Sequence, residues 1–417
     1  MTNTRVKLAI VSNVIAPYRA SQHLRIAREL GEKVELWSLV LFEHDWQPWQ
    51  REFPPEIRPV VFGKGEVLQS KHLHPLRQWL KMGEVIRFLQ DKQIDMVITT
   101  GANDLGLLRL IRWCSKNCIP NFLFGDSNVL GDKADGIRGY LKQLFVGYAV
   151  KHVTGLLPCG VRGKQFFERY GGAHKPVFFL PHEPNYDRIF SISIDQCLAV
   201  QAKYGLQSDR NYFIYSGRLV SVKGVDTLIA AFIRIALDRP DWDLLVVGGG
   251  ELEAELKARV PANLKNRIVW TGFVSDQEEL FALYHSAEVF VLPSRFEPWA
   301  VVVCEAAAAG LAILTSEMVG AGTELCREGY NGAVFPAGDV NNLSDKLLWV
   351  TEDDERLAEL QCNTLQALDD WRRRGDPVQG VRLAMSEVGL LECPKPVEPN
   401  PPTPLERSLE SCTYKSV

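Results

Sequence analysis

The sequence predicts an α/β fold made of two doubly wound, Rossmann-like domains that face a cleft. Three observations lead to this prediction. The chain has 417 residues, of which 46% are hydrophobic, and this exceeds the size at which one hydrophobic core keeps growing. Short β-rich runs alternate with longer amphipathic stretches, which is typical of parallel sheets covered by helices on both faces. The alternation fills the front half and starts again at about Arg210.

The front domain, residues 1–190, contains seven runs rich in β-branched and aromatic residues. We expect strands at KLAIVSNV, KVELWSLVLF, RPVVF, DMVITTG, PNFLFG, TGLLPCG and VFFLP. We expect helices near 19–30, 73–90, 104–116, 137–152 and 161–170. The Pro-rich patch LPHEPNYDRIF follows, and it is interpreted as the connection between the domains.

The second domain, residues 191–370, repeats the unit of a strand followed by a helix. We expect its strands at NYFIYSG, DLLVVGG, RIVWTGF, VFVLPS and LAILTS, and helices from Gly224, Glu251, Asp276 and about Trp299. The segment from Asp353 to about Leu391 is also helical in pattern, with Trp371, Leu383 and Met385 as anchors. We expect the helices around 371–392 to pack back on the front domain. The Pro-rich residues 393–417 are predicted to be a disordered tail.

Charge is distributed unevenly along the chain. Residues 1–190 hold 26 Lys and Arg against 18 Asp and Glu, or +8, which leaves 21 against 33, or −12, for the remainder. A basic front domain could meet an anionic partner such as a membrane surface or a phosphate-bearing acceptor, or the imbalance could be ordinary drift between domains. No apolar run or leader pattern indicates export, so we expect a cytoplasmic protein, peripheral at a membrane in the first case, and no nucleic-acid partner.

The segment RGYLKQLFVGYAVKHV, residues 138–153, allows two interpretations. Four of its apolar residues recur at helical spacing with lysines beside them: Leu141, Leu144, Phe145 and Tyr148. A basic amphipathic helix could lie on a membrane. A helix that faces the core of the sheet domain explains the same stripe, and we favour this second interpretation because core helices are the commoner source of such a period.

The stretch YSGRLVSVKG places two cations after a strand. The strand ends at Ser216, Gly217 permits a tight turn, and Arg218 and Lys223 follow on the loop that leads into a helix. Unpaired N–H groups and the helix dipole add to such charges, so a diphosphate would fit here. The alternative is a surface Arg and Lys in an ordinary loop.

The stretch PSRFEPWAVVVCEAAAAG places two carboxylates at the next informative turn. Glu297 lies just past a strand end, and Glu305 lies on the second turn of the following helix. The N–H groups near Trp299, Ala300 and Val301 would face the same cleft. Carboxylates can take paired hydrogen bonds from sugar or ribose hydroxyls. The alternative is a helix whose first turn happens to be acidic.

The functional interpretation of these turns is supported by their common position at the ends of predicted strands. Gly217-Arg218, Gly248 to Gly250, Gly272-Phe273 and Glu297 all follow predicted strands, so one fold places them around one crevice. From about Asn211 to Leu347 the sequence resembles the nucleotide-sugar domain of the group 1, family-four retaining glycosyltransferases of the GT-B fold. The matching stretches are SGRLVSVKGVDTLIAAF, LLVVGGGELEAEL, VWTGFV, LYHSAEVFVLPSRFEPWAVVVCEAAAAG and NGAVFPAGDVNNLSDKL.

The resemblance implies a role for each matching position. Arg218 and Lys223 would neutralise the leaving diphosphate, Glu297 would hold sugar hydroxyls, and Glu305 would bind the ribose. Backbone around Phe273 and Val274 would read the base. The remaining donor-binding positions are Gly217, Gly248, Trp299, Ala300 and Val301. The family needs no metal and no cofactor beyond its donor, a UDP-, GDP- or ADP-sugar. Asp241-Trp242-Asp243 precedes a strand at the wrong end of the sheet for a metal site in the crevice.

The front domain matches the family less closely. SNVIAPYR lacks the glycine pair of many relatives, and it offers Asn13, Tyr18 and Arg19 for the acceptor or sugar side. Relatives commonly carry a His after the strand equivalent to NFLFG, where this chain has Asp126. The sequence thus predicts a retaining hexosyltransferase whose acceptor is a hydroxyl of a glycan, a lipid-linked glycan or a small metabolite. Two alternatives stay open: a glycan phosphorylase, and an inactive nucleotide-sugar-binding or scaffold protein of the same fold.

Overall fold

The computed structural model describes residues 5–44, 53–68, 75–102, 104–132 and 136–392. Within them the chain forms two compact units. The first holds the residues up to Glu183 and those from Arg374 onward, and the second holds Pro184–Arg373. From the sequence, we predicted domain boundaries at 190/191 and 370/371. The tail predicted for 393–417 lies outside the described residues.

The first unit contains a six-stranded parallel sheet in the order β3-β2-β1-β4-β5-β6. Its strands are β1 (Val6–Ser12), β2 (Val34–Val40), β3 (Pro59–Val61), β4 (Met96–Thr100), β5 (Asn121–Gly125) and β6 (Gly155–Pro158). In the central pairings Leu8 lies opposite Leu36 of β2 and Met96 of β4. β4 is buried over its whole length, as expected for a parallel strand covered on both faces.

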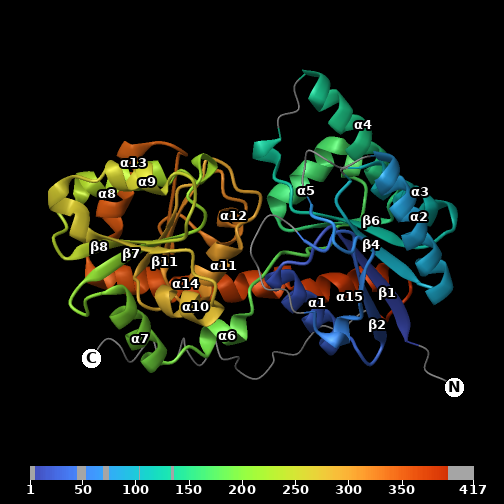
Figure 1. The fold of residues 1–417 in the computed structure, drawn as a ribbon, viewed down its shortest axis with the longest axis horizontal. Coiled ribbons are helices and arrows are strands. Elements are labelled where there is room, and N and C mark those ends of the chain that lie inside the picture. Colours follow the sequence, from blue (N-terminus) through green and yellow to red (C-terminus); the bar gives the residue numbers. More distant parts are fainter. Residues whose placement is uncertain (1–4, 45–52, 69–74, 103, 133–135, 393–417) are drawn as a thin grey trace. The chain divides into compact units, whose positions relative to one another are not determined.

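Helices cover both faces of this sheet. They are α1 (Pro17–Glu29), α2 (Pro75–Lys92), α3 (Leu105–Lys116), α4 (Gly136–His152), α5 (Val161–Phe167) and α15 (Pro377–Glu387), joined by the short turns η1 (Pro55–Ile57), η2 (Val129–Gly131) and η3 (Glu168–Gly172). Figure 1 shows α1 and α15 on one face and α2, α3 and α4 on the other. α15 joins this unit through Arg25 of α1, which donates to Asp376 Oδ2 at 2.8 Å.

One predicted strand of this unit is wrong. VFFLP is extended and hydrogen-bonds to β6, with the Phe178 N–H donating to Leu156 O at 3.0 Å and the Leu180 N–H donating to Pro158 O at 3.0 Å. Only Val177 forms a bridge in it, and it is not a strand of the sheet. Pro176 and Pro181 flank the segment and have no N–H to donate, which limits a ladder at this edge.

The second unit contains another six-stranded parallel sheet, in the order β12-β11-β10-β7-β8-β9. Its strands are β7 (Asn211–Ser216), β8 (Trp242–Val247), β9 (Ile268–Gly272), β10 (Val289–Leu292), β11 (Ala312–Ser316) and β12 (Gly332–Phe335). The five predicted strands are present. β12 was not predicted, because it has only four residues and begins with glycine.

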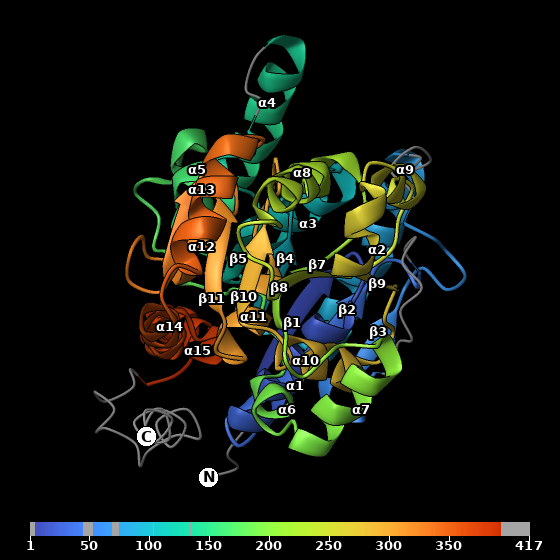
Figure 2. The ribbon, with the colours of Figure 1, turned by 90° about the vertical axis from the view of Figure 1, so that its left-hand side faces the viewer.

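Helices also cover both faces of the second sheet, as Figures 1 and 2 show. They are α6 (Tyr186–Phe190), α7 (Ile194–Tyr204), α8 (Val225–Ile235), α9 (Glu253–Ala258), α10 (Gln277–Tyr284), α11 (Val301–Ala308), α12 (Gly322–Leu325), α13 (Val340–Val350) and α14 (Asp354–Gly375), with the 3₁₀ turns η4 (Ser221–Lys223) and η5 (Ala262–Arg267). α8 packs against α13 on one face, and α10 packs with α6 and α7 on the other.

The helical segment predicted from Asp353 to Leu391 is two helices. α14 ends at Gly375 and α15 begins at Pro377, where Asp376 caps the new helix by accepting from the Gln379 N–H at 2.8 Å. Trp371 and Met385 are buried, as predicted. Leu383 is 38% exposed, so its prediction as an anchor is wrong.

The favoured interpretation of the 138–153 helix is also wrong. Leu141, Leu144 and Tyr148 of α4 are 48%, 49% and 38% exposed. The opposite side of the helix packs into the core instead. Its residues Val146 and Ala149 are 7% and 0% exposed. Among the described residues, none of the helices has the length and apolar character needed to cross a bilayer.

Candidate functional site

The second unit brings its predicted site residues to the carboxyl ends of two adjacent strands. In the sheet, β7 lies between β10 and β8. After β7 the chain forms β8 and β9 on one side of it, and then crosses to form β10, β11 and β12 on the other side. The loops after β7 and β10 therefore diverge at the switch point, where open α/β sheets bind ligands. Gly217, Arg218 and Lys223 follow β7, and Glu297 follows β10.

Lys223 and Glu297 form a direct ion pair between these two loops. Their side chains are 15% and 13% exposed, so the pair is largely withdrawn from solvent. Arg218 is exposed at the end of the β7 loop. Its carbonyl accepts a hydrogen bond of 2.9 Å from the Tyr215 hydroxyl. The loop thus presents two cations, Lys223 in an ion pair and Arg218 at the surface, beside a carboxylate.

A second ion pair, which the sequence did not indicate, fixes the same two loops. Arg295 donates from both terminal nitrogens to the Asp226 carboxylate at 2.8 and 2.7 Å, and it also donates to Ser221 O at 2.7 Å. The Arg295 N–H donates to Val222 O at 2.8 Å. A bidentate guanidinium–carboxylate pair has a defined geometry. It holds the β10 loop against the η4 turn that carries Lys223.

Two glycines are required by the close approach of these loops. A Cβ on Gly224, at φ +65°, would lie 2.2 Å from Pro293 O. A Cβ on Gly248, at φ +131°, would lie 1.9 Å from Gly217 O. Only glycine fits at both positions, which explains the glycines after β7 and β8.

Glu305 lies on α11 with a partner that the sequence did not indicate. Tyr284, at the end of α10, donates to Glu305 Oε2 at 3.0 Å and is itself fully buried. Burial raises the pKa of Glu305 to about 7, while the hydrogen bond from Tyr284 opposes that rise. Burial also raises the pKa of Tyr284, and the Glu305 charge adds to this effect. Tyr284 further interacts with Ser216, so it links Glu305 to the end of β7.

The other residues predicted to bind the donor differ in burial, in backbone conformation and in the strand that they follow. Trp299 is buried against Trp371, with ring centroids 5.6 Å apart. Ala300 has φ +87°, a conformation that costs energy in any residue except glycine, and α11 begins at Val301. Phe273 is 50% exposed and Val274 is buried, both after β9, two strands away from β7.

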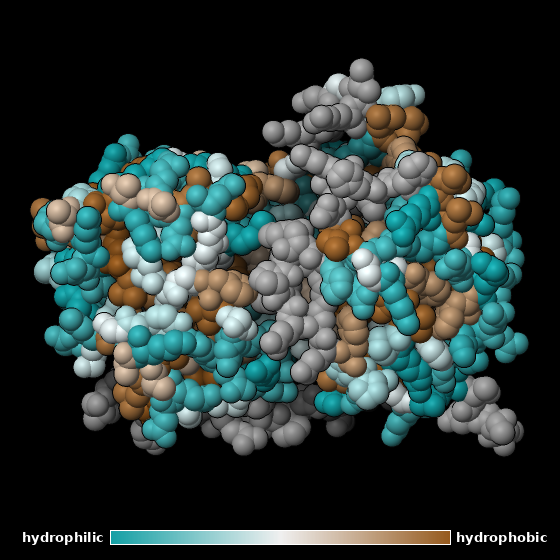
Figure 3. Space-filling model, viewed as in Figure 1, coloured by the Kyte–Doolittle hydropathy of each residue, from teal (hydrophilic) through white to brown (hydrophobic). Residues whose placement is uncertain are grey.

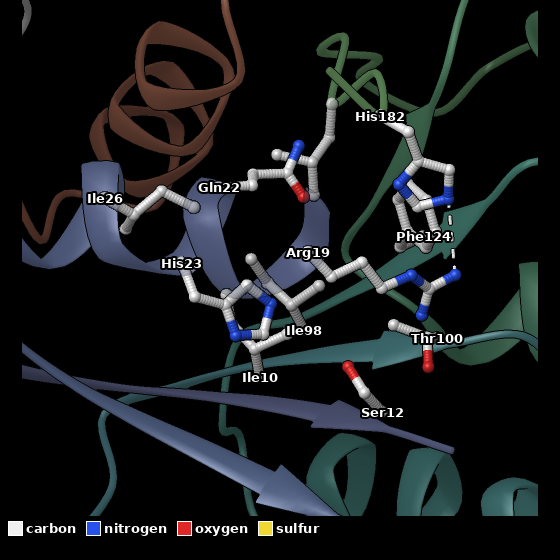
Figure 4. Close-up of a pocket in the computed structure, with 11 residues that line it drawn as sticks. Ile10, Ser12, Arg19, Gln22, His23, Ile26, Ile98, Thr100, Phe124 and His182 are labelled. Carbon is white, nitrogen blue, oxygen red and sulfur yellow. Dashed lines mark hydrogen bonds between the residues drawn. The ribbon is translucent and has the colours of Figure 1, made fainter. Parts of the chain in front are cut away.

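The first unit has its own polar recess at a switch point, between β1 and β4. The recess is lined by Ile10, Ser12, Arg19, Gln22, His23, Ile26, Ile98, Thr100, Phe124, Leu180 and His182. Figure 4 shows Ser12, Thr100, Arg19 and His182 around it. The Ser12 hydroxyl is buried and has no hydrogen-bond partner within the described part of the chain. A buried hydroxyl in this state is suited to an incoming polar ligand or a water.

His182 organises the recess and was not predicted. Its Nε2 lies 3.2 Å from Arg19 Nη2 and 3.8 Å from Asp126 Oδ2, and its ring packs edge-on against Tyr18 at 5.0 Å. Burial lowers the pKa of His182 to about 4, and the Arg19 charge acts in the same direction while Asp126 opposes it. The imidazole is therefore neutral at pH 7, and Nε2 accepts from Arg19.

His182 lies beside three of the four residues predicted for the acceptor or sugar side: Tyr18, Arg19 and Asp126. Burial alone would raise the pKa of Asp126, but His182 and Arg19 lower it to about 2. The Asp126 side chain is 50% exposed beside His182, and it does not line the recess. Asn13 is held through its backbone, since its carbonyl accepts from the Phe42 N–H at 2.8 Å. Asn13 does not line the recess.

Neither unit offers a metal site in the residues that the structure describes. No group of three or more His, Cys, Asp or Glu side chains is suitably placed there. Asp243, of the Asp241-Trp242-Asp243 stretch, lies at the amino end of β8 and pairs with Arg210 and Arg267. Two guanidinium groups neutralise this carboxylate, and they keep it at the sheet end opposite the cluster.

The pairing of cations and carboxylates at the β7/β10 switch point coincides with a sequence match. Residues 199–366 match the family model described as Glycosyl transferases group 1. The second unit is therefore similar to the group 1 glycosyltransferases over these residues. Every predicted donor-side residue, from Gly217 to Glu305, lies inside this match.

Known glycosyltransferases match about half of the chain. Glycogen synthase of Mycobacterium tuberculosis is 33% identical over 198 residues, which cover 46% of this chain and 45% of that protein. The GDP-mannose-dependent α-(1-6)-phosphatidylinositol monomannoside mannosyltransferase of Mycolicibacterium smegmatis is 31% identical over 228 residues, 52% of this chain and 58% of that protein. The chain therefore matches less than two thirds of the length of these relatives.

Solved structures extend the likeness to both units. The Anabaena protein HepE in complex with UDP has a TM-score of 0.69 at 16% identity, covering 93% of this chain and all of that one. At this identity the likeness shows the fold alone. The predicted fold class, two doubly wound Rossmann-like domains of the GT-B type, is confirmed, as is the resemblance of the second unit to the group 1 glycosyltransferases.

Proposed function

We propose that this protein is a retaining, metal-independent glycosyltransferase that moves a hexose from a nucleotide diphosphate sugar to a hydroxyl acceptor. The observation that carries the proposal is the Lys223–Glu297 pair at the β7/β10 switch point, with Arg218 beside it. A cation and a carboxylate at one sheet edge suit the two halves of such a donor, the anionic diphosphate and the neutral, hydroxyl-rich sugar.

The cations act on the leaving group. As the glycosidic bond breaks, negative charge develops on the departing diphosphate, and preorganised cations lower the barrier most when they already lie where that charge appears. Lys223 is held in place by Glu297, and its η4 turn is held by the Arg295–Asp226 pair. Arg218, exposed on the same loop, supplies a second positive charge to the diphosphate.

The carboxylates act on hydroxyl groups. Glu297 accepts hydrogen bonds from the hexose, and Glu305 binds the ribose. Tyr284 fixes Oε2 of Glu305 by a hydrogen bond of 3.0 Å. A pKa near 7 lets the Glu305 carboxyl bind the ribose in either protonation state. Phe273, half exposed after β9, offers a ring and neighbouring backbone to the base. UDP in the HepE structure supports a nucleoside diphosphate as the ligand class.

The exposed side of Asp126 in the first unit is proposed to face the transferred sugar or the acceptor. Asp126 takes the place where the family commonly has His, and His182 lies beside it from another part of the chain. We propose that Asp126 orients a hydroxyl while the charge of Arg19 helps to keep the carboxylate ionised. The acceptor is a glycan, a lipid-linked glycan or a small metabolite. The cytoplasmic location stays a prediction.

The proposal is tested by calorimetric titration of the full chain with UDP, GDP, ADP and their hexose conjugates, first without metal and then with Mg²⁺. We expect one diphosphate to bind without metal and to lose binding in Arg218→Ala and Glu305→Ala. Lys265→Ala and Glu255→Ala are matched controls, because both side chains are exposed on other turns of the same unit. No binding by any of the ligands would refute the transferase and favour the scaffold.

Turnover separates an enzyme from an inactive binding protein. With the bound donor, we expect slow release of the diphosphate to water and faster release when acceptor sugars are added. We expect Asp126→Asn to reduce this release while leaving diphosphate affinity unchanged, since it lies in the other unit. Tight binding with no release under any condition would support the scaffold, and an inverted anomeric signal of the product by NMR would refute retention.

A further inference from the structure

One side of α4 exposes an uninterrupted apolar and aromatic surface, which we call the outer face. It consists of Tyr140, Leu141, Leu144 and Tyr148, which are 65%, 48%, 49% and 38% exposed. Figure 3 shows apolar side chains at the surface over this helix. Single exposed apolar residues are ordinary in proteins, but a group of four on one helix face marks an interaction surface.

The outer face is not needed to hold α4 in the unit. The opposite side packs Val146, Ala149 and Val150 into the core, at 7%, 0% and 1% exposed. Tyr170 of η3 is buried in the same cluster. The helix thus has two apolar sides, one already satisfied by the fold and one left to another surface.

The segment that carries the outer face is basic, although Lys142 pairs with Asp132 and Lys164 pairs with Glu168 just outside it. Residues 136–167 contain no Asp or Glu, and they contain five cations, Arg138, Lys142, Lys151, Arg162 and Lys164. At about 100° per residue, Lys151 falls on the same side of the helix as Tyr140 and Leu144, and it is exposed. Lys142 points to the other side, where it donates to Asp132 Oδ1 at 2.6 Å.

We propose that the outer face of α4 docks this protein on the surface of an anionic lipid bilayer. Leucines enter the acyl boundary, tyrosines suit the headgroup level because their rings are apolar and their hydroxyls polar, and basic residues meet anionic headgroups. The same charge disfavours a second copy of the chain, because a two-fold pairing of this face would bring the basic segments of both copies together, and residues 136–167 hold no acid to pair with them. The inference does not rest on the proposed transfer reaction.

The test is co-sedimentation of the full chain with vesicles of phosphatidylcholine alone and with added phosphatidylglycerol. We expect binding to the anionic vesicles only, weakened by salt. The variant Leu144→Ser/Tyr148→Ser is expected to lower the affinity at least tenfold. The matched control is Ile194→Ser/Leu198→Ser on α7, which also removes an exposed i, i+4 pair (79% and 55%) but lies in the acidic second unit. It is expected to bind like the parent chain.

A charge variant completes the test without touching the apolar residues. Lys151→Gln is expected to weaken binding about fivefold, the effect of one basic residue at an anionic surface, while Lys116→Gln, exposed at the end of α3, leaves it unchanged. The proposal is overturned if the protein ignores both vesicle types, or binds them equally, or if the α4 variants bind like the parent. It is also overturned if sedimentation velocity shows a dimer that Leu144→Ser/Tyr148→Ser abolishes.

Discussion

Replacing Lys223 by methionine should destabilise the second unit more than loss of a surface charge would. Methionine keeps the apolar stem of lysine but removes the charge that faces Glu297. The two side chains are only 15% and 13% exposed, so water replaces the ammonium group poorly. Breaking a buried pair from one side costs about 3–5 kcal/mol, and the residual exposure places this one at the lower end, about 3 kcal/mol.

The double variant Lys223→Met/Glu297→Gln tests the cause. With the charge of Glu297 removed as well, we expect more than half of the lost stability to return, about 1.5–3 kcal/mol. The matched control is Lys257→Met. Lys257 pairs with Glu253 on α9 with 46% and 33% exposure, and such helical surface pairs contribute only about 0.3–0.5 kcal/mol.

The assay is scanning calorimetry of the full chain, followed through the transition of the second unit. A loss of about 3 kcal/mol in a unit of this size lowers its Tm by about 6–12 °C. Lys257→Met should shift it by less than about 2 °C. The reasoning is refuted if Lys223→Met and Lys257→Met shift the Tm equally, or if adding Glu297→Gln lowers the Tm further instead of restoring it.

Two further predictions concern stability in the same unit. The pKa of Glu305 in the folded protein, about 7, lies above its ordinary value of 4.5, so the folded protein binds the carboxyl proton more tightly than the unfolded chain does. The stability that this proton contributes is complete below pH 4.5 and is lost as the pH rises through 7. Urea unfolding at pH 4.5 and 8 should show that Glu305→Gln removes up to ~3 kcal/mol of this pH dependence, and an unchanged dependence would contradict it. Gly224→Ala should cost about 2–4 kcal/mol, because its Cβ would lie 2.2 Å from Pro293 O. Gly205→Ala has a similar φ, +69°, and no atom within 4 Å, so it should cost only about 1–2 kcal/mol; equal losses would show that the contact is not the cause.

Much of the fold was predictable because burial on both faces leaves a strong local pattern. Strands such as Met96–Thr100 and Val289–Leu292 are entirely buried, so each reads as an apolar run between turns. The errors fall where the local pattern is ambiguous. VFFLP has the composition of a strand, yet it pairs with one neighbour only between two prolines. β12 is a strand of four residues, and its pairing with β11 depends on a crossover of the chain rather than on its own composition.

The site was predictable where a motif and a strand end coincide. Lys223 and Glu297 could be placed on the same edge because their strands are parallel, and the structure joins them directly. Their partners could not be found in this way. Tyr284 lies at the end of α10, 21 residues before Glu305, and its neighbours in sequence do not show that its hydroxyl is buried.

The helix α4 shows why periodicity alone does not decide between a core and a surface. A period of 3.6 identifies an apolar side, but α4 has two, and the sequence singled out the more conspicuous leucines and aromatics. The smaller residues Val146 and Ala149 pack into the core, in the cluster that also holds Tyr170 of η3. The large residues are therefore left on the outside, without an acidic residue among them from 136 to 167. The size of the residues on each apolar side is therefore the signal that distinguishes the core-facing side of α4 from its exposed side.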